Sequence, residues 1–368
     1  MSGASAAEAD LRWMRRALEH ARRGLGRTTP NPVVGACVVT PDGVVVGDGC
    51  HERAGEPHAE VFALEEAGHR ARGATLYCTL EPCVHTGRNG PCTERIIAAG
   101  VARVVAAMED PFPLVRGGGF ASLRSHGIVV DSGVARDEAV RLNQPYLISV
   151  REKRPFVILK AATSLDGRMA ALPGERTQLT SLAAARHAHY HRARVDAIAI
   201  GSGTLLADDP LLTPRLVYRE RPLVRVVFDR ALRTPVNARL LSTLTAGPVI
   251  IMTSPITRSL HPDRAGALQR AGATLVDVDD PSLTAAVRHL SRLGIQSVLL
   301  EGGAAVHQAA WEESLVDYVQ LYVAAVTVGA GGPALLEGHP FAPAGLHEGQ
   351  VRSLGPDVLI EGYVHRPD

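Results

Sequence analysis

The chain has 368 residues, enough for about two domains that each bury a core of their own. With 39 Lys and Arg against 38 Asp and Glu, a net charge of +1 and only 4% aromatic residues, its composition argues against a nucleic-acid or membrane-surface protein. No apolar stretch reaches the roughly 18 residues of a membrane span, no secretory signal is present, and five cysteines, an odd number, suit a reducing cytoplasm.

The first half of the chain alternates between helical and strand patterns. We predict a helix over 11–21, a β-hairpin over 33–46 with its turn at 41–43, a helix over 57–68 and a strand over 75–80. Helices near 96–98, 121–126 and from 137, with strands over 101–107 and 128–130, continue the alternation. Pro57 and Pro82 are each expected to begin a helical turn, which would place His58 and Cys83 at helix N-termini.

A domain boundary is predicted where charges and a proline interrupt the apolar pattern, at 151–155. The first domain would then be 1–150 and the second 151–368. The second half carries strand patterns at 156–162, 195–201, 224–229, 249–252, 274–278, 297–300 and 318–326. Helical patterns between several of them, including 181–194 with Ser181 as N-cap, predict a second α/β layer structure.

The pattern that carries most chemistry is His58-Ala59-Glu60, followed by Cys83 and Cys92. One imidazole and two thiolates leave the fourth position of a zinc ion to water, whose pKa the metal lowers to about 7. A carboxylate two residues beyond the histidine can move protons to the substrate ring and to the departing amine. The pattern therefore predicts a zinc deaminase with Glu60 as its proton carrier.

A structural zinc site and no metal at all are the alternatives. Eight residues separate Cys83 from Cys92, whereas the common deaminase pattern has two residues between its cysteines. However, a closed structural site requires four protein ligands, usually in two close pairs, and no second pair is present. Cys37, Cys50 and Cys78 lie in or beside apolar runs and are interpreted as small buried residues. Catalytic zinc is the favoured interpretation.

Longer motifs carry a family resemblance. The first half contains TPNPVVGA at 29–36, GEPHAEV at 55–61, TLEPC at 79–83 and GRNGPC at 87–92, and the second contains LKAATSLDG at 159–167, GTLLADDP at 203–210 and LEGG at 300–303. Over nearly the whole chain, these motifs resemble the bifunctional riboflavin-biosynthesis deaminase/reductase family. The resemblance implies a cytidine-deaminase-like three-layer α/β/α domain followed by a dihydrofolate-reductase-like α/β domain.

The resemblance also implies cofactors, substrate and site residues. Zinc, held by His58, Cys83 and Cys92, would serve deamination of a pyrimidine ribotide phosphate, and NADPH would then reduce the ribosyl group to ribityl. The implied NADPH contacts are Ala162, Gln178, Thr204, Asp208, Arg230, Gly303, Ala304 and Ala305. The implied substrate contacts are Asn31, His85, Arg88, Asp110, Lys160, Arg176, Arg192, Leu212, Arg215 and Glu301.

Residue chemistry makes some of these roles plausible and leaves others open. The glycine-containing turns 201–204 and 301–304 each follow a strand, but without the resemblance they would be taken as ordinary turns. Arginine binds phosphate bidentately, although Arg192 and Arg215 would also suit a solvated helix face and a loop. Glu301 ends an apolar strand and needs a partner or a ligand. Arg230 would suit a cofactor 2′-phosphate or a surface salt bridge equally.

Two departures from the family pattern are evident. Arg176 and Gln178 lie in a segment where family members usually carry a tryptophan, so an aromatic surface expected against the cofactor is lost. Phe112 stands where an asparagine is usual, which replaces a hydrogen-bonding amide with an apolar ring.

Other functions stay open at this point. The second half could be a nucleotide-binding module that transfers no hydride, or both halves could form a scaffold stapled by zinc. A nucleoside or tRNA deaminase would leave about 210 C-terminal residues unexplained. We expect a homo-oligomeric, cytoplasmic enzyme that acts on a small molecule, without nucleic-acid or membrane partners.

Overall fold

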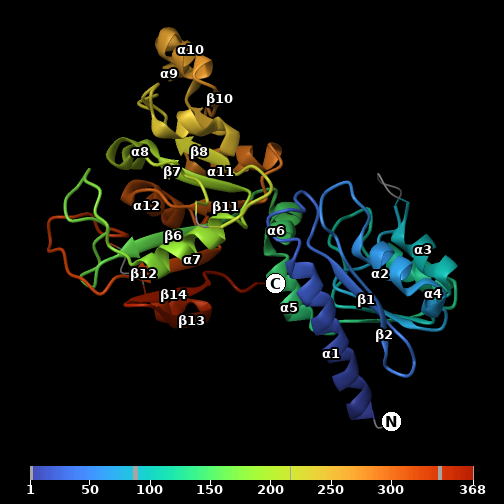
Figure 1. The fold of residues 1–368 in the computed structure, drawn as a ribbon. Coiled ribbons are helices and arrows are strands. Elements are labelled where there is room, and N and C mark those ends of the chain that lie inside the picture. The colour runs from blue at the N-terminus through green and yellow to red at the C-terminus, as the bar shows by residue number, and fades with distance from the viewer. Residues whose placement is uncertain (1–2, 86–89, 216, 339–341, 368) are drawn as a thin grey trace. The chain divides into compact units, whose positions relative to one another are not determined.

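The computed structural model describes residues 3–85, 90–215, 217–338 and 342–367. The chain forms two compact units, one of Met1–Glu152 with Pro367–Asp368 and the other of Lys153–Arg366 (Figure 1). The chain passes from the first unit to the second between Glu152 and Lys153, within the charged segment 151–155 where the boundary was predicted. Each unit has its own hydrophobic core and its own β-sheet.

The first unit is an α/β structure around a mixed sheet. Its elements are α1 (Gly3–Arg22), β1 (Gly35–Val39), β2 (Val45–Cys50), α2 (Ala59–Ala67), η1 (Gly68–Ala71), β3 (Thr75–Cys78), α3 (Cys92–Ala99), β4 (Arg103–Ala106), α4 (Gly118–Ser125), β5 (Val129–Ser132), α5 (Arg136–Leu142) and α6 (Gln144–Glu152). Within the described residues, the strands form one sheet in the order β2-β1-β3-β4-β5. Because β3, β4 and β5 run parallel, the loops that follow β3 and β4 emerge at the same edge.

Helices lie directly on this sheet where glycines replace side chains. A Cβ added to Gly49 of β2 would lie 2.0 Å from the carbonyl oxygen of Ala59, and one added to Gly35 of β1 would lie 2.0 Å from that of Ala17. Gly49 pairs with Ala36, the neighbour of Gly35, so the two glycines face opposite sides of the sheet. Consequently α1 and α2 cover opposite faces, which confirms the expected three-layer fold (Figure 1).

One local prediction in this unit is wrong. No helical turn begins at Pro82, because residues 81–84 have no regular secondary structure. Their backbone bonds elsewhere: the Glu81 N–H donates to the Met108 carbonyl (3.0 Å), and the Cys83 carbonyl accepts from the Thr93 N–H (3.2 Å). Cys83 therefore lies on a loop, whereas the predicted hairpin and the helix that ends at Gly68 are confirmed.

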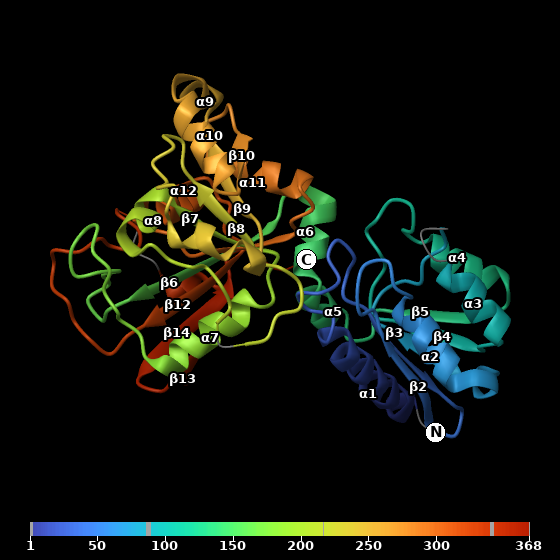
Figure 2. The ribbon, with the colours of Figure 1, turned by 45° about the horizontal axis from the view of Figure 1, so that its top comes forward.

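The second unit has a longer sheet. Its elements are β6 (Phe156–Thr163), α7 (Leu182–Arg192), β7 (Ala197–Gly201), α8 (Ser202–Asp208), β8 (Val224–Phe228), η2 (Arg239–Ala246), β9 (Val249–Thr253), α9 (Pro255–Leu260), α10 (Pro262–Arg270), β10 (Ala273–Asp277), α11 (Leu283–Arg292), β11 (Ser297–Leu300), α12 (Ala304–Glu312), β12 (Tyr318–Val323), η3 (Pro343–Gly345), β13 (His347–Leu354) and β14 (Asp357–Tyr363). In the described part of the chain, the strand order is β10-β9-β8-β7-β11-β6-β12-β14-β13. Figure 2 shows α9 and α10 beside β10, at one end of this order.

In the sheet order from β10 through β6 to β12, each pair of adjacent strands is parallel, whereas β12 and β14 are antiparallel. Strands β7, β9 and β11 are buried along their whole length, as expected for apolar strands covered on both faces. The carboxyl ends of β7, β11 and β6, which are adjacent strands, therefore meet at one edge of the sheet. This edge carries the glycine-containing turns noted in the sequence.

The predicted N-cap of α7 is confirmed, since the Ser181 hydroxyl accepts a hydrogen bond from the Ala184 N–H (3.4 Å). The antiparallel hairpin of β13 and β14 was not predicted. Across the residues that the structure describes, no helix is both long enough and apolar enough to span a membrane.

The contact between β2 and α2 gives a first prediction. Gly49→Ala should push α2 away from the sheet and destabilise the first unit by about 1–3 kcal/mol. Because Ala59 lies between His58 and Glu60, zinc content should fall as well. Urea unfolding followed by Trp13 fluorescence, in a Trp311→Phe background, would test this together with metal analysis. An unchanged unfolding midpoint and unchanged zinc content would contradict it.

Candidate functional site

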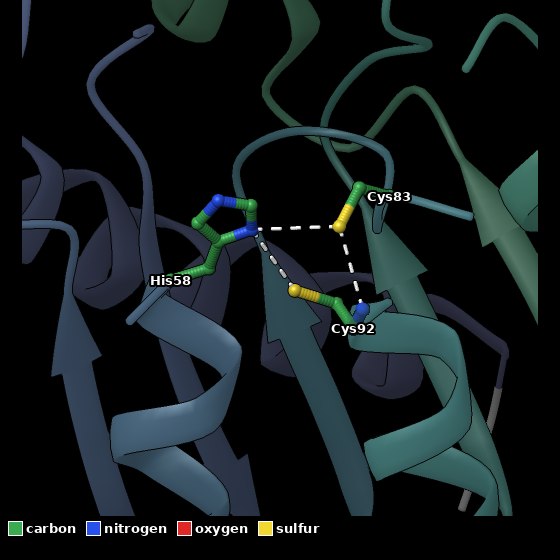
Figure 3. A group of neighbouring side chains, drawn as sticks. All are labelled: His58, Cys83 and Cys92. Carbon is green, nitrogen blue, oxygen red and sulfur yellow. Dashed lines mark hydrogen bonds between the residues drawn. The ribbon is translucent and has the colours of Figure 1, made fainter. Parts of the chain in front are cut away.

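Three potential metal ligands from separate segments meet in the first unit (Figure 3). His58 is the N-cap of α2, Cys92 begins α3, and Cys83 lies on the loop after β3. The His58 Nδ1 atom is 3.1 Å from Cys92 Sγ and 3.5 Å from Cys83 Sγ. Their ligand atoms all lie within 4.8 Å of one another. One ring nitrogen and two sulfur atoms thus converge on one point.

The electrostatics of this group favour a bound cation. Hydrogen bonds from Cys92 and then from His58 hold the pKa of the Cys83 thiol well below its usual value, although burial opposes them. The Cys92 N–H also donates to Cys83 Sγ (3.3 Å), so the N-terminus of α3 faces this sulfur. Conversely, the bond with Cys83, burial and the Glu60 carboxyl raise the pKa of Cys92. These groups cannot all ionise together unless a cation compensates them.

Glu60 lies beside the ligands without being one of them. It is only 3% exposed, and burial raises the pKa of its carboxyl, although the nearby His58 acts against this. Its buried Oε2 atom has no hydrogen-bond partner among the residues that the structure describes. Three protein ligands and a neighbouring carboxyl with a free oxygen fit a catalytic zinc site rather than a closed structural one.

A second histidine, which the sequence analysis missed, connects Asn31 to this site. The His51 Nδ1–H donates to the Pro57 carbonyl (3.0 Å), so the neutral Nε2 atom accepts from the Asn31 amide (3.0 Å). Burial lowers the pKa of His51, which favours this neutral form. Its ring packs edge-on at 5.4 Å from that of His58. In the sequence, only the position of His51 directly after β2 and seven residues before His58 could have indicated that it belongs to this site.

Asp110 and Phe112 lie on the loop after β4, near the two cysteine ligands. The Asp110 carboxylate accepts from the Tyr146 hydroxyl (2.8 Å) and the Phe112 N–H (2.9 Å), and burial raises its pKa. Phe112 packs against the apolar cluster that includes Cys83 and Cys92, and its ring centroid is 6.2 Å from that of His85. Arg88, the other predicted contact in this region, lies outside the described residues.

In the second unit, the turns after β7 and β11 pack closely against each other. A Cβ added to Gly302 would lie 2.5 Å from Ile200 Cα, and one added to Gly303 (φ +51°) would lie 2.7 Å from Thr204 Oγ1. Ala304 and Ala305 form the first turn of α12, and Ala162 lies near the end of β6, the strand next to β11. The predicted NADPH contacts of this region therefore gather where exposed backbone can approach a phosphate.

A partly buried charge cluster lies beside these turns. Arg192 donates to both carboxylate oxygens of Glu301, at 2.7 and 2.6 Å, and to the Thr213 carbonyl at 3.3 Å. Burial acts to raise the pKa of Glu301, but the charges of Arg192 and Lys160 outweigh it and hold that pKa at about 2. Burial lowers the pKa of Lys160, whose Nζ atom lies 5.4 Å from the centroid of the Tyr322 ring. Arg192 thus pairs with the carboxylate that the sequence left without a partner.

His189 holds the loop that carries Leu212 and Arg215, and it too was missed. Burial, with the charges of Arg192 and Arg215, lowers the pKa of His189 to about 4, so its neutral Nδ1 atom can accept the Arg215 N–H (3.3 Å). The Arg215 side chain is exposed. Leu212 is buried in the core with a positive φ of 54°.

The remaining predicted residues lie apart from this cluster. Burial raises the pKa of Asp208, but the charge of nearby Arg176 opposes this effect. Gln178 is exposed and donates to the Thr180 carbonyl (2.9 Å). Arg230 donates to a backbone carbonyl at 3.1 Å and lines a small pocket together with Ala305.

Comparison with known proteins agrees with this arrangement. Residues 155–360, more than half of the chain, match the family described as RibD C-terminal domain. The chain belongs to the RibD family. Residues 7–108 match the family described as cytidine and deoxycytidylate deaminase zinc-binding region, which contains His58, Glu60, Cys83 and Cys92.

Relatives match over nearly their whole length. Riboflavin biosynthesis protein RibD of Aquifex aeolicus is 40% identical over 324 residues, which are 88% of this chain and 89% of that protein. The structure of Acinetobacter baumannii RibD matches with a TM-score of 0.85 and 36% identity, covering 96% of this chain and 98% of that one. A Thermotoga maritima structure, described as a diaminohydroxyphosphoribosylaminopyrimidine deaminase/5-amino-6-(5-phosphoribosylamino)uracil reductase, matches with a TM-score of 0.83 and 33% identity, covering 97% and 99%.

Membership of this family confirms the function, the activities and the cofactors that were predicted from the sequence. The protein is a bifunctional enzyme of riboflavin biosynthesis, with a deaminase and a reductase activity. Its cofactors are zinc and NADPH. The alternative in which the second half is a non-reducing module is not favoured.

The Glu301 cluster predicts how the second unit responds to acid. The pKa of the Glu301 carboxyl falls from about 4.5 in the unfolded chain to about 2 in the fold. Ionised Glu301 therefore stabilises the folded second unit fully above pH 4.5, and this stabilisation is lost as the pH falls towards 2. The loss should reach about 3 kcal/mol. Urea unfolding followed by Trp311 fluorescence, in a Trp13→Phe background, would measure it. Glu301→Gln should flatten the dependence, and an equally steep fall in that variant would assign it to other groups.

Proposed function

We propose that the first unit deaminates a ribosylated diaminopyrimidinone phosphate and that the second then reduces its ribosyl group to a ribityl chain. The name of the Thermotoga maritima relative supports this substrate. One observation carries the first step: Glu60 is buried near the His58, Cys83 and Cys92 ligand atoms, and its Oε2 atom has no hydrogen-bond partner in the described part of the chain.

In the deaminase site, His58, Cys83 and Cys92 hold zinc. When bound, zinc supplies a water that ionises near neutral pH. Glu60 would take one proton of this water at its free oxygen and pass it to a ring nitrogen. It would then take the remaining proton, from the added hydroxyl, and pass it to the departing amine, which leaves as ammonia.

Two groups of residues in this site are proposed to contact the pyrimidine ribotide. Asn31, oriented by His51, and Asp110, oriented by Tyr146, are proposed to bind the pyrimidine. His85 and Arg88 are proposed to bind the ribosyl phosphate. Phe112 offers an apolar ring where the family pattern has an amide, so it contributes packing rather than a hydrogen bond.

In the reductase site, the cofactor is proposed to lie along the carboxyl ends of β6, β7 and β11. When bound, NADPH supplies the hydride. The proposed contacts are Ala162, Gln178, Thr204, Asp208, Arg230, Gly303, Ala304 and Ala305. The close packing of Gly303 against Thr204, which leaves no room for a side chain, supports this assignment.

The ribosyl phosphate is proposed to bind beside the cofactor. Lys160 and Glu301 hold the sugar hydroxyls and assist protonation, and Arg192 keeps Glu301 ionised and oriented. Arg176, Leu212 and Arg215 complete the proposed substrate contacts. The exposed guanidinium of Arg215, on a loop held by His189, is the one best placed to bind the phosphate.

Further proposals concern the domains and their setting. We assign deamination to 1–150 and reduction to 151–368, and we expect a homo-oligomer without nucleic-acid partners. None of the five cysteines, all within the described residues, forms a disulfide, which suits a reducing cytoplasm.

Replacing the proposed proton carrier tests the deamination. Glu60→Gln should keep its zinc, because Glu60 is not a ligand, but should slow ammonia release by about a hundredfold or more. Zinc analysis and ammonia assay with the pyrimidine ribotide would check both results. Near-normal turnover in the zinc-loaded variant would remove Glu60 from the mechanism.

Removing the metal tests the division between the units. Chelation should abolish ammonia release, since the ligands hold the only metal that the first step requires. NADPH oxidation with the deaminated intermediate should continue, and added zinc should restore ammonia release. Deamination that persists after metal analysis shows no zinc would contradict this account.

A further inference from the structure

Glu81 is a buried carboxylate that binds backbone from two segments of the first unit. It is 3% exposed. Its Oε2 atom accepts from the N–H groups of Asp110 (3.2 Å) and Gly117 (3.0 Å), and its Oε1 atom accepts from those of Gly119 (2.9 Å) and Phe120 (3.2 Å). One side chain thus satisfies four backbone donors from the loop after β4 and the first turn of α4.

These segments border the deaminase site. Glu81 itself lies two residues before Cys83, on the metal side. The loop that it binds contains Asp110 and also Val115, which packs with Cys83 and Cys92. Glu81 therefore connects a metal ligand to the proposed pyrimidine contact through a single side chain.

The contact is tight and has a specific chemical requirement. A Cβ added to Gly119 would lie 2.0 Å from the Pro82 carbonyl oxygen and 3.2 Å from Glu81 Oε1, so α4 begins directly against the loop of Cys83. An ionised carboxylate offers two oxygens that each accept two bonds, whereas an amide has one oxygen and presents N–H groups in place of the other. Glutamine at this position would leave at least two buried N–H groups without an acceptor.

We propose that Glu81 is a positioning residue for deamination, which sets Asp110 at its working distance from the metal ligands. This inference rests on the proposed function, in which Asp110 binds the pyrimidine. Bound zinc holds Cys83 independently of Glu81. Loss of the Glu81 carboxylate therefore displaces the loop of Asp110 more than the metal ligand Cys83.

Glu81→Gln tests this role. The KM for the pyrimidine ribotide should rise by about tenfold or more, while kcat changes by less than about threefold and zinc content stays as in the wild type. The amides of Asp110, Gly117, Gly119 and Phe120 should exchange hydrogen faster. NADPH oxidation with the deaminated intermediate should be unchanged.

Glu66→Gln is the matched control. Glu66 also accepts a backbone hydrogen bond, from the Asp48 N–H (2.8 Å), but it does so at an exposed position on α2. This variant should keep the wild-type KM.

The remaining outcomes overturn the inference. A wild-type KM in Glu81→Gln would show that the Glu81 carboxylate does not position Asp110 for substrate binding. Loss of zinc and of the native Trp13 fluorescence would show that Glu81 only maintains the fold. If the wild-type protein itself releases no ammonia, the proposed function fails, and the role of Glu81 in deamination fails with it.

Discussion

The direct packing of α2 on strand β2 is the constraint on which the metal centre depends. Because Gly47 and Gly49 carry no side chains, the backbone of α2 lies against the strand at Ala63 and Ala59. This contact fixes the first turn of the helix and thereby the backbone positions of His58 and Glu60, on either side of Ala59. The parallel strands β3 and β4 then bring the loops of Cys83 and Asp110 to the same edge.

The two sites share this topology but differ in their electrostatics. In both units, segments that directly follow parallel strands supply part of the site, such as Cys83 after β3 in the first unit and Glu301 after β11 in the second. In the first unit, two thiols and a carboxyl crowd together and require a cation. In the second, Arg192 and Lys160 already compensate Glu301, so this cluster is complete without a metal. The difference fits hydrolysis assisted by zinc in one site and transfer from an organic cofactor in the other.

Sequence alone predicted the parts whose chemistry is local. The spacing of His58, Glu60 and the two cysteines was sufficient for the metal site, and strong apolar runs were sufficient for the central strands. Residues that act through distant backbone, such as His51 and His189, could not be found, because their partners are set by tertiary packing. The β13 strand was missed because it is exposed along most of its length and lacks an apolar alternation. The turn at Pro82 was mispredicted because the Glu81 and Cys83 backbone groups bond to other segments.

The central claim is that one chain performs two consecutive reactions on one pyrimidine ribotide. It is tested most directly by incubating the purified full-length protein with the diaminopyrimidinone ribotide, with and without NADPH, and measuring the mass of the product. Exchange of an amino group for oxygen should add about one mass unit without NADPH, and hydride transfer with protonation should add about two more with it. A product that gains only the first increment in the presence of NADPH, or neither, would contradict the account.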